Sequence, residues 1–376
     1  MKKVLQVTIG DTFRGTEKIE LDWFRIINKE VKFDFLVVDD KVFNLYKDEI
    51  NKLGGNIYNI NVKYTSLKNK IIYFYRLYKF LRNNQYDAIH INSSAFFYSF
   101  IVAIISKLKK IPKIIIHSHS LPLINKTKKS IIKLLNPVYR VFFDEYLACS
   151  KKAANALFTN NFIKKDGVKI LKNGIDIEKF KFNENLRKEY RKKFNISNEI
   201  VLGNVGVLEN QKNHMYLIDI FYEIQKINTN TILLLIGEGK DKEKIQEKVK
   251  KLKIEEKVKF LGFRDDVSNI LNCMDIFIFP SLSEELGIAA IEAQTNGLIT
   301  YCSTKVPEEA KISNNFRFFN LDEKPYEIAR KIYNENINIE NRYIAFEYTL
   351  KCGYDIKDVS YELLKIYLNW IHIGEL

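Results

Sequence analysis

Two glutamates, Glu284 and Glu292, stand eight positions apart in "SEELGIAAIEAQ" (283–294), around Gly287 and a run of small apolar residues. A carboxylate in apolar surroundings must be paired, hydrogen-bonded or available for a ligand. A helix that begins after serine and glycine also presents backbone N–H groups and a positive dipole end, which suit a phosphate. The alternative is that Glu284 only caps the helix and Glu292 lies on a solvated face.

A glycine turn followed by a lysine forms a second candidate. In "GNVGVLENQKNH" (203–214), Gly206 ends a strand and Lys212 opens the next helix, where an ammonium group can neutralise a diphosphate. Surface lysines are common in this sequence, so the signal is weak by itself. Gly237 and Gly239 follow another strand but break the GxGxxG pattern, so a dinucleotide fold of the dehydrogenase kind is poorly supported.

Two histidines end a strand in the first half of the chain. His117 and His119 in "KIIIHSHS" lie on one face of that strand because side chains alternate. They could bind a metal, but no third ligand with suitable spacing is evident, and no Asp-x-Asp, Walker loop, HExxH or GxSxG pattern occurs. We therefore predict no metal site, and a structural role in hydrogen bonding is the simpler interpretation of the histidines.

The elements that position these residues alternate between strand and helix, which predicts parallel sheets with crossover helices. Since ligands bind beyond the carboxyl ends of parallel strands, polar residues just after strands are the candidates. Two similar α/β units joined near residue 180 are the simplest organisation, with a polar segment at about 180–198. The predicted strands are 3–9, 33–38, 56–60, 87–91, 113–117, 145–149 and 168–171, then 200–206, 231–237, 258–262, 275–280 and 298–302.

Length and composition set the class of protein. With 376 residues, 46% apolar and 28% charged, the chain is expected to fold as two domains. The start of the chain resembles a first strand more than a signal peptide, and the longest apolar stretch, 95–105, is too short to span a bilayer. Four cysteines without metal-ligand spacing suit small core residues in a reducing cytosol, so a cytoplasmic location is expected.

The net charge of +14 is concentrated in the first half. Residues 51–180 hold 23 Lys and Arg against 6 Asp and Glu, whereas residues 181–376 hold 28 against 30. An excess of this kind indicates an anionic partner, such as membrane lipid, a phosphate-bearing acceptor or nucleic acid. No aromatic-basic module for nucleic acid is visible. Codon bias that scatters lysine over solvated faces explains the total charge better than its uneven distribution.

Taken together, the segments resemble one family. "FPSLSEELGIAAIEAQTNGLI" (279–299) is similar to the E-x7-E signature of family-4 glycosyltransferases, with Glu284 and Glu292 as the two acids and Gly287 between them. The flanking segments follow in the family's order over nearly the whole chain, among them "RGTE" (14–17), "LKNGIDIEKF" (171–180) and "MDIFIFPS" (274–281). The closest resemblance is to retaining bacterial enzymes of exopolysaccharide and capsular polysaccharide synthesis.

The resemblance implies a GT-B fold, in which two Rossmann-like domains face each other across a cleft. Residues 1–180 would bind the acceptor and residues 181–355 the nucleotide-sugar, while a helix within 356–376 would pack back on the first domain. The donor is a substrate rather than a cofactor, most commonly a UDP-sugar, and no cofactor is expected. A saccharide or lipid-linked saccharide would accept the sugar with retention, at the inner face of an anionic membrane.

The resemblance also implies a role for each candidate residue. Glu292 would bind the ribose hydroxyls and Glu284 the hydroxyls of the sugar ring. The backbone after Gly287, starting at Ile288, would hold the diphosphate. Lys212 would neutralise the leaving phosphate, and the glycine turns at Gly206 and Gly237 would border it. The remaining roles are Arg264 or its neighbours beside the base, His119 at the donor sugar with His117 as the second choice, and Gly15 in a glycine loop over the phosphates.

Two positions depart from the family pattern. Val207 follows Gly206 where the family usually has arginine, and Glu285 stands where a glycine is usual. Both changes make the donor pocket less positive. They keep open the alternative of a catalytically degenerate GT-B scaffold protein. A sugar-nucleotide epimerase on the same fold, which needs no acceptor, is a second alternative to the glycosyltransferase.

Overall fold

The computed structural model describes residues 1–8, 15–38, 46–62, 66–93, 95–119, 141–158 and 167–369. The chain divides into two compact units, Met1–Gly174 with Ile356–Leu376 and Ile175–Asp355. The division falls shortly before the boundary predicted near residue 180, because Ile177 and Phe180 of helix α8 (Ile177–Phe180) belong to the hydrophobic core of the second unit.

The first unit is built on a seven-stranded sheet in the order β3-β2-β1-β4-β5-β6-β7, and all of its strand pairs are parallel. Runs of Val, Ile and Leu in the central strands fit a sheet that is buried on both faces. The strands are β1 (Lys2–Thr8), β2 (Val31–Val37), β3 (Asn56–Asn59), β4 (Ala88–Asn92), β5 (Lys113–Ser118), β6 (Glu145–Ala148) and β7 (Lys169–Ile170).

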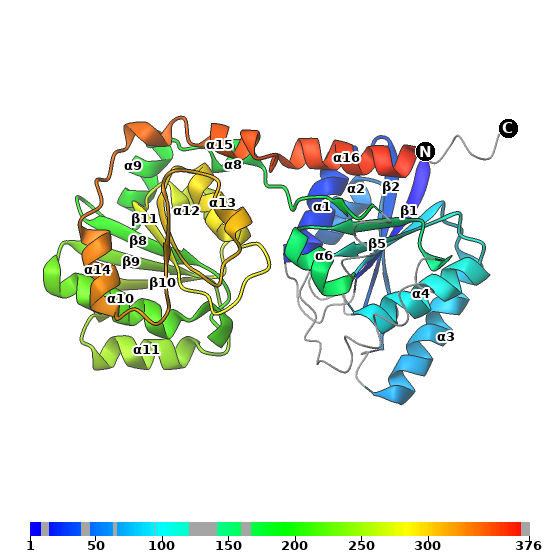
Figure 1. Cartoon of the computed structure of the whole chain (residues 1–376), viewed down its shortest axis with the longest axis horizontal. Helices are drawn as coiled ribbons and strands as arrows, with labels where there is room; N and C mark the ends of the chain where they lie inside the picture. The colour runs from blue at the N-terminus through cyan, green and yellow to red at the C-terminus, as the bar shows by residue number, and fades with distance from the viewer. Residues whose placement is uncertain are drawn as a thin grey trace. The chain divides into compact units, whose positions relative to one another are not determined.

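Helices cover both faces of this sheet (Figure 1). On one face, α3, α4 and α6 bury a core that includes Tyr73, Tyr98 and Leu157. On the other, α1 packs beside α16, so a helix from the C-terminal part of the chain completes the first unit as predicted. The helices are α1 (Gly15–Ile27), α2 (Lys47–Lys52), α3 (Leu67–Asn83), α4 (Phe96–Leu108), α6 (Lys151–Leu157) and α16 (Ile356–Leu368).

The second unit repeats the plan with a six-stranded parallel sheet in the order β10-β9-β8-β11-β12-β13. The strands are β8 (Ile200–Val205), β9 (Thr231–Ile236), β10 (Val258–Gly262), β11 (Ile276–Phe279), β12 (Ile299–Ser303) and β13 (Phe316–Phe319). One hydrophobic core lies on each face, since α8, α12, α13 and α15 pack on one side and α10, α11 and α14 on the other (Figure 1).

The helices of this unit are α8, α9 (Glu184–Lys193), α10 (His214–Ile227), α11 (Lys242–Lys251), α12 (Val267–Leu271), α13 (Ile288–Thr295), α14 (Pro325–Tyr333) and α15 (Phe346–Lys351). The polar segment predicted at 180–198 contains α9, which Arg187 anchors through Asp275, 2.6 Å away. Strand β13 was not predicted. Across the described ranges of the chain, none of the helices combines the length and apolarity needed to cross a bilayer.

Candidate nucleotide-sugar site

Lys212 and Glu284 meet at the carboxyl edge of the second sheet. The ammonium Nζ of Lys212 lies 2.6 Å from Oε1 of Glu284 and 4.8 Å from the centre of the Phe279 ring. Both side chains are largely shielded, with 21% and 10% of the side chain exposed. An ion pair in such surroundings is screened far less than one on the surface. The structure thus brings together two predicted site residues from loops that follow different strands.

Hydrogen bonds fix these two loops to each other. The backbone N–H of Leu282 donates to the carbonyl of Gln211, and the Gln211 side chain donates to the carbonyl of Ser283, each at 2.8 Å. Below them, the Ser303 hydroxyl donates to the Ser281 carbonyl at 2.5 Å. Sequence reasoning missed Gln211 and Ser303, because a single polar residue next to a motif carries no signal of its long-range partner.

A second unpredicted pair holds the start of α10. The ring Nε2 of His214 lies 3.0 Å from Oδ1 of Asn204, whose amide nitrogen donates to the carbonyl of Ile278 at 2.7 Å. Burial, with the nearby Lys212 charge, lowers the pKa of His214 to about 4, so the ring is neutral at pH 7. This bridge joins β8, β11 and α10 and so positions Lys212, which stands two residues before His214.

One glycine allows the turns after β8 and β9 to come this close. Gly237 has a φ of 138°, and a Cβ there would lie only 2.0 Å from the carbonyl oxygen of Gly206. At Gly206, by contrast, a Cβ would lie 3.4 Å from Cγ and Cδ of Lys212, which is ordinary contact with a flexible side chain. Of these two predicted glycines, Gly237 therefore has a clear steric reason, and Gly206 is the position where the aliphatic part of Lys212 packs.

Helix α13 starts beside Lys212 and Glu284. Its N-cap, Gly287, is in the left-handed conformation with φ 85°, and a Cβ there would lie 3.1 Å from Val306. Ile288 is the first helical residue and is half-buried, while Glu292 lies one turn later on the same side of the helix and is 6% exposed. Glu292 is therefore buried, and the alternative that it lies on a solvated face is wrong.

The guanidinium of Arg264 is used in hydrogen bonds within the second unit. Its Nε donates to Oδ1 of Asp266 at 2.7 Å, and its Nη2 also contacts that carboxylate. Asp266 in addition accepts a hydrogen bond from the Tyr190 hydroxyl at 2.9 Å and stands directly before α12. The neighbour Phe263, by contrast, has 71% of its surface exposed. Of the residues predicted beside the base, Phe263 has an exposed ring on which a base could stack. The Arg264 guanidinium is instead used in hydrogen bonds to Asp266.

The two departures from the family pattern lie at this edge as well. Val207 is 52% exposed and Glu285 is half-buried. A further lysine stands nearby, since Lys305 directly precedes Val306, the residue that packs against Gly287. Lys305 is exposed, its backbone N–H donates to the Ser303 hydroxyl, and its ammonium has no ion pair among the described residues. It is a candidate for the missing second cation.

The predicted residue His119 belongs to the first unit and is 4% exposed. Its Nε2 lies 3.1 Å from Oδ1 of Asn92, and its ring centre lies 3.8 Å from that of His117. His117 continues a buried stack through His90 to Trp23, with ring centres 5.3 to 5.8 Å apart. Burial lowers the pKa of all three histidines, of His119 to about 4, so the rings are neutral at pH 7.

The histidine stack also holds helix α16. The Tyr367 hydroxyl lies 2.6 Å from Nδ1 of His90 and 3.1 Å from the amide of Gln6, which donates to it. Gly15 begins α1, but the loop before it lies outside the described residues. Within the described ranges, no three His, Cys, Asp or Glu side chains are arranged to hold a metal ion.

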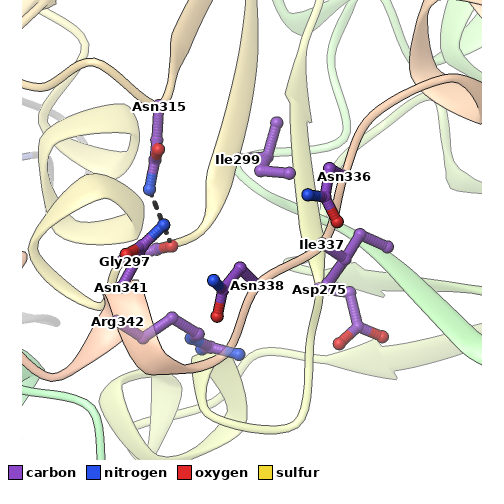
Figure 2. Close-up of a pocket in the computed structure, with 9 residues that line it drawn as sticks. All are labelled: Asp275, Gly297, Ile299, Asn315, Asn336, Ile337, Asn338, Asn341 and Arg342. Atoms are coloured by element: carbon purple, nitrogen blue, oxygen red, sulfur yellow. Dashed lines mark hydrogen bonds between the residues drawn. The ribbon is translucent and has the colours of Figure 1, made fainter.

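A pocket opens at the opposite, amino end of the second sheet (Figure 2). Its charged groups are used internally: Arg342 donates to the carbonyls of Asn296 and Met274, and Asp275 is paired with Arg187. These contacts fasten the ends of α12 and α13 rather than present free groups to a ligand. The pocket is lined by Asp275, Gly297, Ile299, Asn315, Asn336, Ile337, Asn338, Asn341 and Arg342.

Comparison with known proteins identifies matching families in both halves of the chain. Residues 46–179 match the sequence model of Glycosyltransferase Family 4, and residues 187–332 match that of Glycosyl transferases group 1. The chain is 25% identical over 319 residues to the putative glycosyltransferase EpsF of Bacillus subtilis, covering 82% of this chain and 80% of EpsF.

Two further proteins extend the comparison. The Escherichia coli UDP-Gal:alpha-D-GlcNAc-diphosphoundecaprenol alpha-1,3-galactosyltransferase is 23% identical over 335 residues, covering 85% of this chain and 84% of that enzyme. The crystal structure of Anabaena HepE in complex with UDP has a TM-score of 0.77 at 17% identity, covering 97% of this chain and 99% of that one. The structural likeness confirms the predicted fold class.

Proposed function

Since the chain belongs to the family-4 glycosyltransferases of GT-B fold that act in bacterial polysaccharide biosynthesis, we propose that it transfers a hexose from a UDP-sugar to a lipid-linked saccharide with retention of configuration. The observation that carries the proposal is the Lys212–Glu284 pair beside the start of α13. A cation, a helix N-terminus and two shielded carboxylates meet there, which is the set of groups that a sugar diphosphate requires.

The chemistry centres on the departing UDP. As the bond between the sugar and the diphosphate breaks, negative charge grows on the phosphate oxygen while the sugar becomes positively charged. Lys212 and the backbone N–H groups that open α13 at Ile288 would stabilise the phosphate. Glu284 would then exchange its contact with Lys212 for the hydroxyls of the sugar. The acceptor hydroxyl would attack from the same face and pass its proton to the departing phosphate oxygen, which gives retention without a protein nucleophile.

The nucleotide would be held on either side of that point. Glu292, one turn inside α13, would accept hydrogen bonds from the two ribose hydroxyls, and Phe263 would lie against the base. UDP is favoured because HepE was crystallised with UDP and the Escherichia coli relative is named for a UDP-galactose donor. The same relative is named for a diphosphoundecaprenol-linked acceptor, which favours a lipid-linked acceptor and work at the membrane surface.

Calorimetric titration with UDP tests the proposal. Loss of a charged hydrogen-bond acceptor costs about 1.5–3 kcal/mol, so Glu292→Gln should weaken UDP binding by roughly 10- to 100-fold. The matched control is Glu335→Gln, a half-buried carboxylate on the same unit that pairs with Arg317 at 3.0 Å. It should leave UDP binding unchanged. Equal affinities for the wild type and Glu292→Gln, with both proteins folded, would overturn the site assignment.

An activity assay separates transfer from the alternatives. Purified protein is incubated with a UDP-sugar, with and without a diphosphate-linked saccharide acceptor, and in EDTA. A product that forms only with acceptor, retains the anomeric configuration and persists in EDTA agrees with the proposal. Interconversion of the sugar nucleotide without acceptor would identify an epimerase. If the protein neither binds the sugar nucleotide nor forms a product, it is a scaffold.

A further inference from the structure

The outer face of α3 is apolar and aromatic but exposed. Leu67, Ile71, Tyr75 and Tyr78 follow at intervals of three or four residues, so they form one stripe along the helix, called here the α3 stripe. Their exposed fractions are 76%, 64%, 67% and 41%. The opposite side of α3 already supplies the core with Tyr73, Leu77 and Leu81. Packing within the unit therefore does not explain why the stripe is apolar.

The charge on helix α3 itself has one sign, while on the neighbouring α4 Lys107 pairs with Asp144. Helix α3 carries five Lys and Arg and no Asp or Glu. In the sequence from Glu49 to Asp144, the only acid between these two is Asp87, against 16 Lys and Arg. Lys68 at one end of the stripe and Lys79 and Arg82 at the other are exposed. A surface with this combination of charge and apolar side chains is complementary to an anionic, partly apolar partner.

Helix α4 extends the same surface. The two helices lie side by side (Figure 1), and Lys109, just after α4, places its ammonium 3.4 Å from the centre of the Tyr78 ring. Leu108, the last residue of α4, is 68% exposed. The surface is thus wider than one helix and adds another cation and another leucine to the edge of the stripe.

Composition alone does not produce such a face, as α11 shows. Helix α11 also carries five basic residues, all of them lysine, but its exposed side mixes Lys with Glu243 and Glu247. Its apolar residues Ile245 and Val249 are buried. A lysine-rich codon bias therefore gives a surface of mixed charge on α11. Helix α3, by contrast, contains no acidic residue, and its large apolar side chains are exposed.

We propose that the α3 stripe, with the cations around it, docks on the surface of an anionic lipid bilayer. Leu67, Ile71 and Tyr75 would enter the boundary between headgroups and acyl chains, and Lys68, Lys79 and Arg82 would remain among the lipid phosphates. The inference deepens the proposed function, on which its purpose rests, because it names the surface at which the enzyme would meet a lipid-linked acceptor. The surface belongs to the first unit, and the groups assigned to UDP belong to the second.

Vesicle flotation of the full chain tests the proposal. We expect binding to vesicles of phosphatidylcholine with about one third phosphatidylglycerol, little binding to phosphatidylcholine alone, and a decrease as salt rises. Each cation near an anionic surface is worth roughly a fivefold change in partitioning. The triple variant Lys68→Glu/Lys79→Glu/Arg82→Glu should therefore lose binding by more than 100-fold. Its matched control, Lys244→Glu/Lys250→Glu/Lys251→Glu on α11, makes the same charge change and should bind almost as the wild type.

Insertion of the stripe is measured separately from attraction of charge. Tyr75→Trp should show a blue shift of its emission on the anionic vesicles, whereas Tyr333→Trp, a 54% exposed tyrosine on α14, should not. Leu67→Ser/Ile71→Ser should weaken flotation without lowering the melting temperature, because both side chains are exposed. Tyr326→Ser/Tyr333→Ser on α14 is the matched control for loss of exposed apolar surface.

Several results would overturn the inference. If wild-type protein binds UDP but does not float with anionic vesicles, the α3 stripe does not dock on a membrane. The proposed function would not be affected by this result. Binding to a short RNA that depends on α3, in place of vesicle binding, would assign the surface to nucleic acid. Self-association in sedimentation that Leu67→Ser/Ile71→Ser abolishes would assign it to a second copy of the chain. Failure to bind UDP would instead count against the proposed function alone.

Discussion

The two sheets of the molecule end differently at their carboxyl edges. In the second unit, short glycine turns place Lys212, Glu284 and Glu292 around the start of one helix. In the first unit, the described residues in and just after β4 and β5 form a buried cluster of neutral rings and amides, in which His90, His117 and His119 are fully or almost fully buried. One fold plan thus serves two purposes, since charges at the edge suit a diphosphate and buried neutral groups fix the helices above the sheet.

The largest test of this difference is Lys212→Ala. Removing the cation should lower the rate of transfer by about 100- to 1,000-fold, as for other groups that stabilise a leaving charge, and weaken UDP binding. The control is Lys248→Ala on α11, because that lysine is equally shielded and pairs with Asp219 at the same 2.6 Å. Calorimetry and initial rates should show a loss for Lys212→Ala only. Similar losses for both variants would mean that general stability, not the site, decides activity.

For the buried histidines of the first unit, we expect an effect of pH on the stability of the fold rather than on UDP binding. Burial lowers the pKa of His119 to about 4, against about 6.5 in the unfolded chain. The unfolded state therefore binds more protons below pH 6.5, so stability is complete above that pH and falls as the pH drops toward 4. One such histidine costs about 2 kcal/mol by pH 5. Glu20 acts in the other direction, because burial and Glu17 raise its pKa.

His117→Phe isolates the histidine part of this effect. Neither ring nitrogen of His117 makes a hydrogen bond of good geometry within the described ranges, although the Leu171 backbone lies near. The variant keeps a ring in the stack and removes one titrating group. Its melting temperature should therefore fall less between pH 7 and pH 5 than that of the wild type. Parallel curves for the two proteins would show that His117 does not contribute to acid sensitivity.

Much of the fold was predictable because buried parallel strands are continuous runs of Val, Ile, Leu and Phe between glycines. Strand β13 was missed because "FRFF" is short and contains Arg317. Helix α9 was missed because its anchors, Arg187 and Arg191, bind Asp275 and so carry no hydrophobic periodicity. In the site, the residue types of Lys212 and Glu284 indicated their chemistry, but 72 positions separate them, so their pairing needed the structure.

The assignment of the base is a smaller and sharper test, since sequence reasoning named Arg264 or a neighbour. Arg264 is held by Asp266, whereas the Phe263 ring is open. Stacking of a base on an aromatic ring is worth about 1–3 kcal/mol, so Phe263→Ala should weaken UDP binding roughly tenfold. Arg264→Ala should change the melting temperature more than the affinity. If Arg264→Ala instead weakens UDP binding and Phe263→Ala does not, the base contacts Arg264.

The smallest expected effect concerns the cation that the family pattern lacks at Val207. Lys305 is exposed, so solvent screens its charge, and its contribution to a diphosphate should be modest. Lys305→Ala should weaken UDP binding by about three- to fivefold and leave uridine binding unchanged, because uridine has no phosphate. The loss should shrink at high salt, unlike the loss in Lys212→Ala, whose ammonium is shielded. If uridine binding also falls, Lys305 supports the structure of the loop rather than the phosphate. Val207→Arg offers the complementary test, since restoring the second cation should strengthen UDP binding in Lys305→Ala more than in the wild type.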